Sequence, residues 1–116
     1  MINILVIDDD EAVLDNISLV IKSVGYRITK ASNGEEGIKK FDQSVFDVVI
    51  TDLFMPLKDG NEVARYIRDA GKNIPIIGIT GMPEHIDPAF FDKVLKKPFS
   101  LKELIAYLKE IADTKT

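Results

Sequence analysis

The sequence predicts an α/β fold in which a five-stranded parallel sheet carries helices on both faces. Short runs rich in valine and isoleucine alternate with segments whose apolar residues recur every three or four positions. The runs also lack the strict alternation of polar and apolar residues that is typical of a sheet with one solvent-exposed face. A chain of 116 residues suits one such domain, residues 1–116. Right-handed crossovers then favour a doubly wound sheet of order 2-1-3-4-5.

The expected strands are short and enriched in β-branched residues, as strands buried on both faces are. They are Asn3–Asp8, Arg27–Ala31, Val45–Thr51, Ile74–Thr80 and Val94–Lys96.

Helix signals fill the intervals between these strands. An apolar stripe at Val13, Ile17, Val20 and Val24 predicts a first helix, and Gly25 is expected to end it. Later helix starts are each marked by a capping side chain three residues before a glutamate. These pairs are Asn33 with Glu36, Asp59 with Glu62, and Ser100 with Glu103.

The interval between Thr80 and Lys97 is short, with only sixteen residues separating them. We expect a shortened fourth helix there. Asp87 and Pro88 suit its N-cap and first position, which leaves a helix of about residues 89–92.

Composition excludes several classes of function. The chain has 15 Lys+Arg, 19 Asp+Glu and no cysteine, and it has no basic cluster. Direct nucleic-acid binding is therefore not expected, nor is thiol chemistry. No apolar run is long enough to cross a bilayer, and the N-terminus lacks the features of a secretory signal. We expect a cytoplasmic protein without a membrane partner.

Acidic, hydroxyl and basic side chains follow the expected strands at the ends that meet on one edge of the sheet. They are Asp8, Asp9, Asp52, Thr80 and Lys97. Three ionised carboxylates about 5 Å apart would repel by about 3 kcal/mol per pair at an effective dielectric of about 20. Lys97 offsets part of this. The remainder predicts a bound Mg²⁺, with a raised pKa on one aspartate as the alternative.

These residues resemble the receiver domain of bacterial two-component response regulators, and the resemblance covers essentially the whole chain. It implies a flavodoxin-like fold. The matching motifs are Asp8-Asp9, Asp52 within Thr51–Pro56, Asp59-Gly60, Thr80-Gly81 and Lys97-Pro98-Phe99.

The resemblance implies a role for each site residue. Asp52 would accept the phosphoryl group from a histidine kinase or phosphotransfer protein. Asp9, Asp52 and the Phe54 carbonyl would contact Mg²⁺, with Asp8 binding through water. Lys97, the Thr80 hydroxyl and the Gly81 amide would hold the phosphoryl oxygens. Output would be partner binding. The domain would promote its own phosphorylation without being an enzyme for an external substrate.

Some positions depart from the family pattern. Val94 stands where the family usually has tyrosine or phenylalanine, so the family's aromatic switch cannot run through it. Phe54 and Met82 are expected to overhang the phosphoryl group and slow its hydrolysis. We assign His85 no role.

Two alternative functions stay open. One is an unphosphorylated docking module, favoured by Val94 and the short fourth helix. The other is a Mg²⁺-dependent phosphatase with Asp52 as nucleophile, although Phe54 stands where such enzymes place a second aspartate.

Overall fold

A five-stranded parallel sheet of order β2-β1-β3-β4-β5 forms the centre of the computed structural model, which describes residues 1–114. The strands are β1 (Asn3–Ile7), β2 (Arg27–Ala31), β3 (Val48–Asp52), β4 (Ile76–Thr80) and β5 (Lys93–Lys96). The predicted fold class and strand order are confirmed. β3 and β4 begin two or three residues later than expected, and Pro75, which has no N–H to give to a ladder, directly precedes β4.

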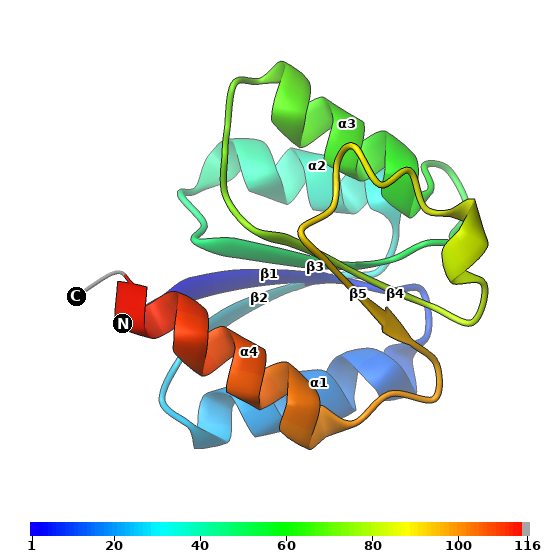
Figure 1. Cartoon of the computed structure of the whole chain (residues 1–116). Coiled ribbons are helices and arrows are strands. Elements are labelled where there is room, and N and C mark those ends of the chain that lie inside the picture. Colours follow the sequence, from blue (N-terminus) through cyan, green and yellow to red (C-terminus); the bar gives the residue numbers. More distant parts are fainter. Residues whose placement is uncertain (115–116) are drawn as a thin grey trace.

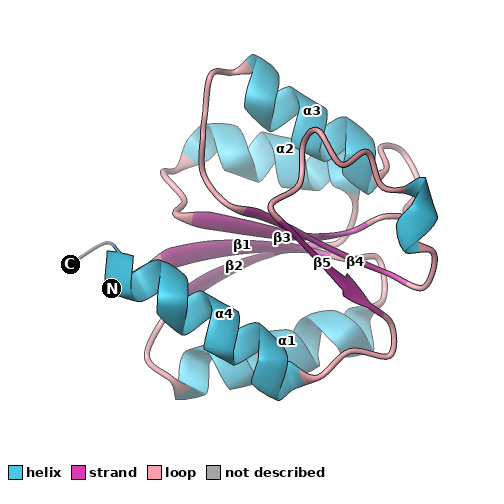
Figure 2. Ribbon diagram, in the orientation of Figure 1, coloured by secondary structure: helices cyan, strands magenta, loops and turns pink. Residues whose placement is uncertain are grey.

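Four α-helices cover the sheet in pairs (Figure 1). They are α1 (Glu11–Ser23), α2 (Gly34–Gln43), α3 (Gly60–Asp69) and α4 (Leu101–Thr114). Helices α1 and α4 lie on one face and α2 and α3 on the other, so the fold has three layers (Figure 2). β3 and β4 are buried along their whole length, as strands between two helical layers should be.

The predicted helix ends are found. The Asn33 side chain accepts a hydrogen bond from the Glu36 amide, and Asp59 and Glu62 bond each other's backbone in a full capping box. Ser100 Oγ accepts from the Glu103 amide at 3.2 Å. Gly25 follows the first helix with a φ of 90°, a conformation that glycine adopts without strain.

The crossover from β4 to β5 differs from the prediction. No α-helix forms over residues 89–92. The helical part of this crossover is a 3₁₀ turn, Pro83–His85, and residues 88–90 make an ordinary turn. Asp87 does accept a hydrogen bond from the Ala89 amide, as a cap would, but no helix follows it. The segment is too short to form a helix and also reach the start of β5.

Side chains, rather than a helix, hold this crossover against the sheet. Gly78 in β4 leaves room for Ile86 and Phe91, since a Cβ there would lie 2.5 Å from the Ile86 side chain and 3.0 Å from the Phe91 ring. Asn61 in α3 donates to the His85 carbonyl and accepts from the Asp87 amide. The crossover therefore packs on the face that carries α2 and α3 (Figure 1).

The Arg68 guanidinium holds the last residues of the same crossover in place. It donates to the carbonyls of Lys72, Ile74 and Phe90 and forms an ion pair with Asp92 at 2.8 Å. Asp92 also accepts from the amide of Ile76. One side chain thus joins the end of α3 to the start of β4 and the end of the crossover.

Among the described residues, none of the helices combines the length and the apolar character that a bilayer span requires.

Replacing Gly60 with alanine tests how closely α3 approaches β3. A Cβ at Gly60 would lie 2.4 Å from the Asp52 carbonyl oxygen, a backbone atom that cannot rotate away. Overpacking costs about 1–3 kcal/mol, more than the roughly 1 kcal/mol by which alanine favours a helix over glycine. We expect Gly60→Ala to lower the free energy of unfolding in urea by about 1–2 kcal/mol.

The matched control for this substitution is Gly81→Ala, because nothing lies within 4 Å of a Cβ at Gly81. Its free energy of unfolding should change by less than about 0.5 kcal/mol. Equal effects of the two substitutions would contradict the close approach.

Candidate functional site

The side chains predicted to converge do so at the carboxyl ends of the strands. Carboxylate oxygens of Asp8, Asp9 and Asp52 all lie within 4.8 Å of one another. Lys97 Nζ lies 3.1 Å from Asp52 Oδ1 and 3.6 Å from Asp8 Oδ2. Asp52 ends β3, Asp8 and Asp9 follow β1, and Lys97 follows β5. The parallel topology places these separate segments at one edge of the sheet, as expected.

Burial differs among the three carboxylates. Asp8 is 2% exposed and Asp52 is 8% exposed, whereas Asp9 faces solvent. Asp8 Oδ1 accepts the Asp10 amide at 2.8 Å. Asp8 Oδ2 is buried and receives no hydrogen bond from any residue in the range 1–114. A buried acceptor without a hydrogen bond is costly, and the Lys97 ammonium approaches it only to 3.6 Å, so this oxygen marks a place where a cation or a donor would be bound favourably.

The pKa values of the buried acids are raised. Burial is the main cause of the raised pKa of Asp8, which reaches about 6. The charges of Asp52 and Asp9 raise it further, while the Asp10 amide and Lys97 lower it. Burial also raises the pKa of Asp52, against the opposing effect of the Lys97 hydrogen bond. Burial is the largest single influence on the pKa of Lys97 and lowers it, but the hydrogen bonds and charges of Asp52 and Asp8 together outweigh burial and leave the pKa above its ordinary value. Lys97 therefore stays an ammonium at neutral pH.

Thr80 and Gly81 lie beside this cluster, at the end of the neighbouring strand. The backbones of β3 and β4 are paired up to Asp52 and Ile79, and Thr80 follows directly. Its side chain is 1% exposed, and its hydroxyl oxygen accepts the Met82 amide at 3.0 Å. No described residue accepts a hydrogen bond from this hydroxyl, because in its bond with Met82 the hydroxyl oxygen is the acceptor. The hydroxyl proton is therefore available to a ligand.

Phe54 and Met82 are exposed apolar side chains in the loops that follow β3 and β4. They are 53% and 46% exposed. The Phe54 ring meets the His85 ring edge-on, with centroids 5.7 Å apart. His85 therefore has a contact that the sequence did not suggest. A lone histidine in a polar loop gives no sequence signal for an aromatic contact. The position of Asn61 in the sequence likewise does not indicate that its side chain donates to the His85 carbonyl.

The acidic cluster fits a hard divalent cation. Its potential ligands are carboxylate oxygens from three residues, the kind of ligand that Mg²⁺ prefers. Only one ammonium, that of Lys97, lies near to balance their negative charge in the described part of the chain. Asp8 Oδ2, which receives no hydrogen bond, adds an acceptor to this set. The raised pKa of Asp8 agrees with the predicted alternative, although burial contributes more to it than the neighbouring carboxylates do.

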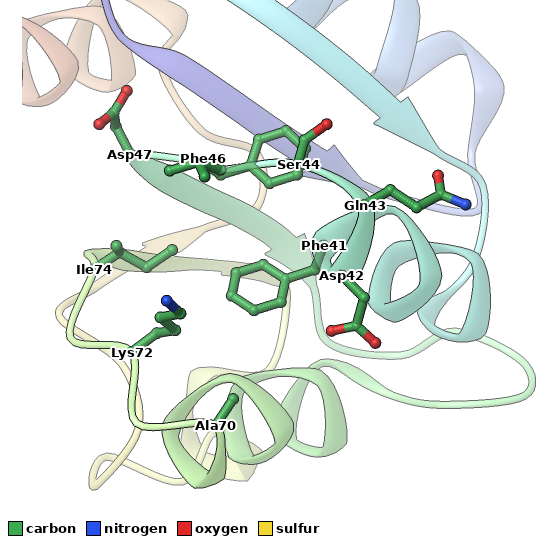
Figure 3. A pocket seen from close by; sticks show the side chains of 10 residues that line it. Phe41, Asp42, Gln43, Ser44, Phe46, Asp47, Ala70, Lys72 and Ile74 are labelled. Carbon is green, nitrogen blue, oxygen red and sulfur yellow. The ribbon is translucent and has the colours of Figure 1, made fainter.

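A separate pocket of about 520 Å³ lies at the opposite end of the sheet, between the ends of α2 and α3 (Figure 3). Phe41, Phe46 and Ile74 supply apolar walls, and Lys72 lies at its rim. Asp42, on the α2 side, is bonded to the Tyr66 hydroxyl at 2.6 Å. None of the predicted site residues lines this pocket, so it is not part of the acidic site.

Stability should depend on pH in a direction set by Asp8. An acid whose folded pKa lies above its unfolded value binds more protons in the folded state, so its ionisation destabilises the fold. Without divalent ions, we expect the free energy of unfolding to fall by about 3 kcal/mol as pH rises from about 4 to about 6, given the shift from 3.8 to about 6. Asp8→Asn should remove the part of this fall that Asp8 causes, leaving that of Asp52, and should raise stability at pH 7.

Chemical denaturation in a chelating buffer measures this effect, with Asp69→Asn as a control at an exposed aspartate. The control should keep the slope of the parent chain. Stability that rises across this window would contradict the assignment.

Comparisons with known proteins agree with this geometry. A sequence model of the response regulator receiver domain matches residues 4–109. The chain is 33% identical over 113 residues to the alkaline phosphatase synthesis transcriptional regulatory protein PhoP of Bacillus subtilis, covering 93% of this chain and 47% of PhoP. It is 34% identical over 115 residues to the response regulator MprA of Mycolicibacterium vanbaalenii, covering 95% of this chain and 50% of MprA. The chain thus spans about half the length of these curated relatives.

Solved structures show the same fold. The response regulator TrrA of Thermotoga maritima, in complex with Mg²⁺-BeF, superposes with a TM-score of 0.87 at 34% identity, over 96% of this chain and 99% of that one. A receiver domain from Clostridium thermocellum gives a TM-score of 0.89 at 28% identity, over 99% and 97% of the two chains. With the sheet order, the acidic cluster and the lysine all in place, the chain belongs to the response regulator receiver domain family.

Proposed function

We propose that this domain accepts a phosphoryl group on Asp52 from a histidine kinase or phosphotransfer protein and passes on the signal by binding a partner. The observation that carries the proposal is the Asp52 carboxylate itself. It ends a buried strand, lies among two further carboxylates, and has the Lys97 ammonium at 3.1 Å. Membership in the receiver family supports the same assignment.

The proposed transfer is an attack by an Asp52 oxygen on the phosphorus of phosphohistidine. An oxygen–phosphorus bond forms and the nitrogen–phosphorus bond breaks, so the electron pair returns to the imidazole. In this proposal the Lys97 ammonium donates to the phosphoryl oxygens, and so do the Thr80 hydroxyl and the Gly81 amide, as the resemblance to the family implies. No external metabolite is turned over, so the domain promotes its own modification and is not otherwise an enzyme.

We further propose that the acidic cluster holds Mg²⁺ through Asp8, Asp9, Asp52 and the Phe54 carbonyl. A bound cation would supply positive charge to the transferred phosphoryl oxygens. The mutual approach of the three carboxylates and the unpaired Asp8 Oδ2 support this. The Thermotoga TrrA structure, which contains Mg²⁺ and BeF, supports the same choice of ion.

Phosphorylation should require Asp52. Incubation with Mg²⁺ and a small acyl phosphate should add one phosphoryl mass to the intact chain, measured by mass spectrometry. Asp52→Asn should add none, because an amide is not a competent nucleophile at phosphorus. The exposed control Asp69→Asn should be modified like the parent chain. Modification of Asp52→Asn to the same extent would place the acceptor elsewhere.

A second candidate is a docking module that works without phosphorylation. It is favoured by Val94, a small and 36% exposed side chain at the position of the family's aromatic switch, and by a crossover without an α-helix. Partner affinity that is unchanged in Asp52→Asn, and unchanged by the phosphodonor in the parent chain, would favour this candidate.

Phe54 and Met82 should slow the loss of the phosphoryl group. Exposed apolar side chains beside Asp52 and Thr80 obstruct the line along which water attacks phosphorus. Phe54→Asn combined with Met82→Glu should speed hydrolysis on the order of tenfold, which corresponds to about 1.4 kcal/mol of barrier. Phosphate release after removal of the donor measures this rate.

The control for this pair is Leu57→Asn, which removes an apolar side chain from the same loop. Leu57 is 68% exposed, and its φ of 74° suits asparagine. Its rate of hydrolysis should stay close to that of the parent chain. A double variant that hydrolyses no faster than Leu57→Asn would refute the idea.

A further inference from the structure

The outer edge of β5 is left open by the short crossover. β5 ends the sheet and pairs with β4 only. Residues 86–92 lie over the face that carries α2 and α3, where Ile86 and Phe91 fill the space at Gly78 and Arg68 holds Asp92. Figure 2 shows β5 at the near edge of the sheet, with α4 on one side and the crossover loop on the other. No helix runs along this edge within the described part of the chain.

Two peptide units of β5 face outward along this edge. The Lys97 amide donates to the Thr80 carbonyl of β4 at 2.9 Å. Because alternate residues of a strand direct their peptide groups to opposite sides, Lys93 and Leu95 also face β4, whereas Val94 and Lys96 face away. Within residues 1–114 no hydrogen bond reaches the amide or carbonyl of Val94 or Lys96 from that outer side. These groups are free to pair with another strand.

The opposite edge of the sheet is protected differently. There the outward carbonyl of Lys30 in β2 accepts a hydrogen bond from Lys40 Nζ of α2 at 2.6 Å. The side chain of α2 thus occupies an acceptor that an added strand would use. β5 has no such cover among the described residues, so the two edges are not equivalent.

A pocket of about 400 Å³ lies beside β5 on the crossover side. Its apolar walls are Pro83, Ile86, Pro88, Phe91 and Val94, and the charged Glu84, Asp92 and Lys93 also line it. Val94 is 36% exposed there. A side chain of a strand lying along β5 and pointing to the same face as Val94 would enter this pocket.

The charges around the edge favour an acidic occupant. Lys96 is exposed, and Lys93 lies with its Nζ 5.6 Å from the Tyr107 ring centroid without an ion pair among the described residues. Two acids also line the pocket; the Asp92 charge is already paired with Arg68, which leaves Glu84 against the two lysines. A second copy of this chain fits poorly, because the antiparallel pairing that uses both outward units of each β5 sets Lys93 of one copy opposite Lys97 of the other. Like charges directly opposite are destabilising.

We propose that β5 binds an extended peptide segment of a partner protein by strand addition, with acidic side chains at Lys93 and Lys96 and an apolar side chain in the pocket beside Val94. Main-chain hydrogen bonds to the two outward peptide units hold the segment, and the pocket and the lysines select its sequence. The edge is open while Asp52 is unmodified, so this binding does not depend on the proposed phosphorylation.

The test titrates the ¹⁵N-labelled full chain with a short extended peptide that places glutamates opposite Lys93 and Lys96 and a valine opposite Val94. The Val94 and Lys96 amide signals should shift saturably and become protected from hydrogen exchange. The same peptide methylated on alternate backbone nitrogens should not bind, because it cannot complete the ladder. The same peptide with lysine in place of each glutamate should bind with at least about tenfold lower affinity. Equal binding of the methylated or the basic peptide, or no shift at residues 94 and 96, would overturn the proposal.

Two variants sharpen the test. Val94→Pro removes an outward N–H and no ladder bond, so it should abolish binding, whereas Ile28→Pro, at an outward position of β2, should leave binding unchanged. If Val94→Pro does not fold, Lys93→Glu with Lys96→Glu serves instead. That variant should prefer the basic peptide, and an unchanged preference for the acidic peptide would refute the role of the lysines.

Discussion

Three carboxylates share one ammonium at the carboxyl edge of this sheet, and the rest of the site depends on that imbalance. Asp8, Asp9 and Asp52 lie within 4.8 Å of one another, while Lys97 contributes a single positive charge at 3.1 Å from Asp52. Burial, together with the charges of Asp52 and Asp9, raises the pKa of Asp8 to about 6, and Asp8 Oδ2 receives no hydrogen bond from the described residues. Excess negative charge around such an acceptor favours a cation, and a bound cation would in turn attract an anion.

The topology makes this crowding unavoidable. In a parallel sheet every strand ends at the same edge, and the order β2-β1-β3-β4-β5 puts β1 and β3 side by side where the winding reverses. Gly60 lets α3 start against the Asp52 carbonyl, and so the loop after β3 turns back tightly. Asp52 is thus held by a buried strand and Asp8 by the hydrogen bond from its amide to the Ala31 carbonyl, so these two acids stay close to each other. The core stabilises an arrangement that the charges alone would oppose.

Sequence patterns were sufficient for the sheet, the caps and the charged cluster, because each depends on local chemistry or on the common direction of parallel strands. Asp59 with Glu62 and Gly25 with its positive φ are of this kind. The crossover before β5 was predicted less well. Asp87-Pro88 is a genuine capping signal, but the helix it suggests is absent, because the chain here is placed by distant partners such as Gly78 and Arg68. The contact between Phe54 and His85 was missed for the same reason.

The Arg68 guanidinium shows how a domain of this kind can be shortened. It bonds three carbonyls and one carboxylate, drawn from the turn after α3, the approach to β4 and the last part of the crossover. In most layered folds those segments are fixed by a helix lying over the strands, which takes many residues. Here the planar Arg68 side chain with its five donors does part of this, together with Asn61 and the packing at Gly78. The connection between two strands can therefore lose residues as long as the hydrogen-bonding partners at its two ends are retained. Insertions and deletions in homologous domains should concentrate between those two ends.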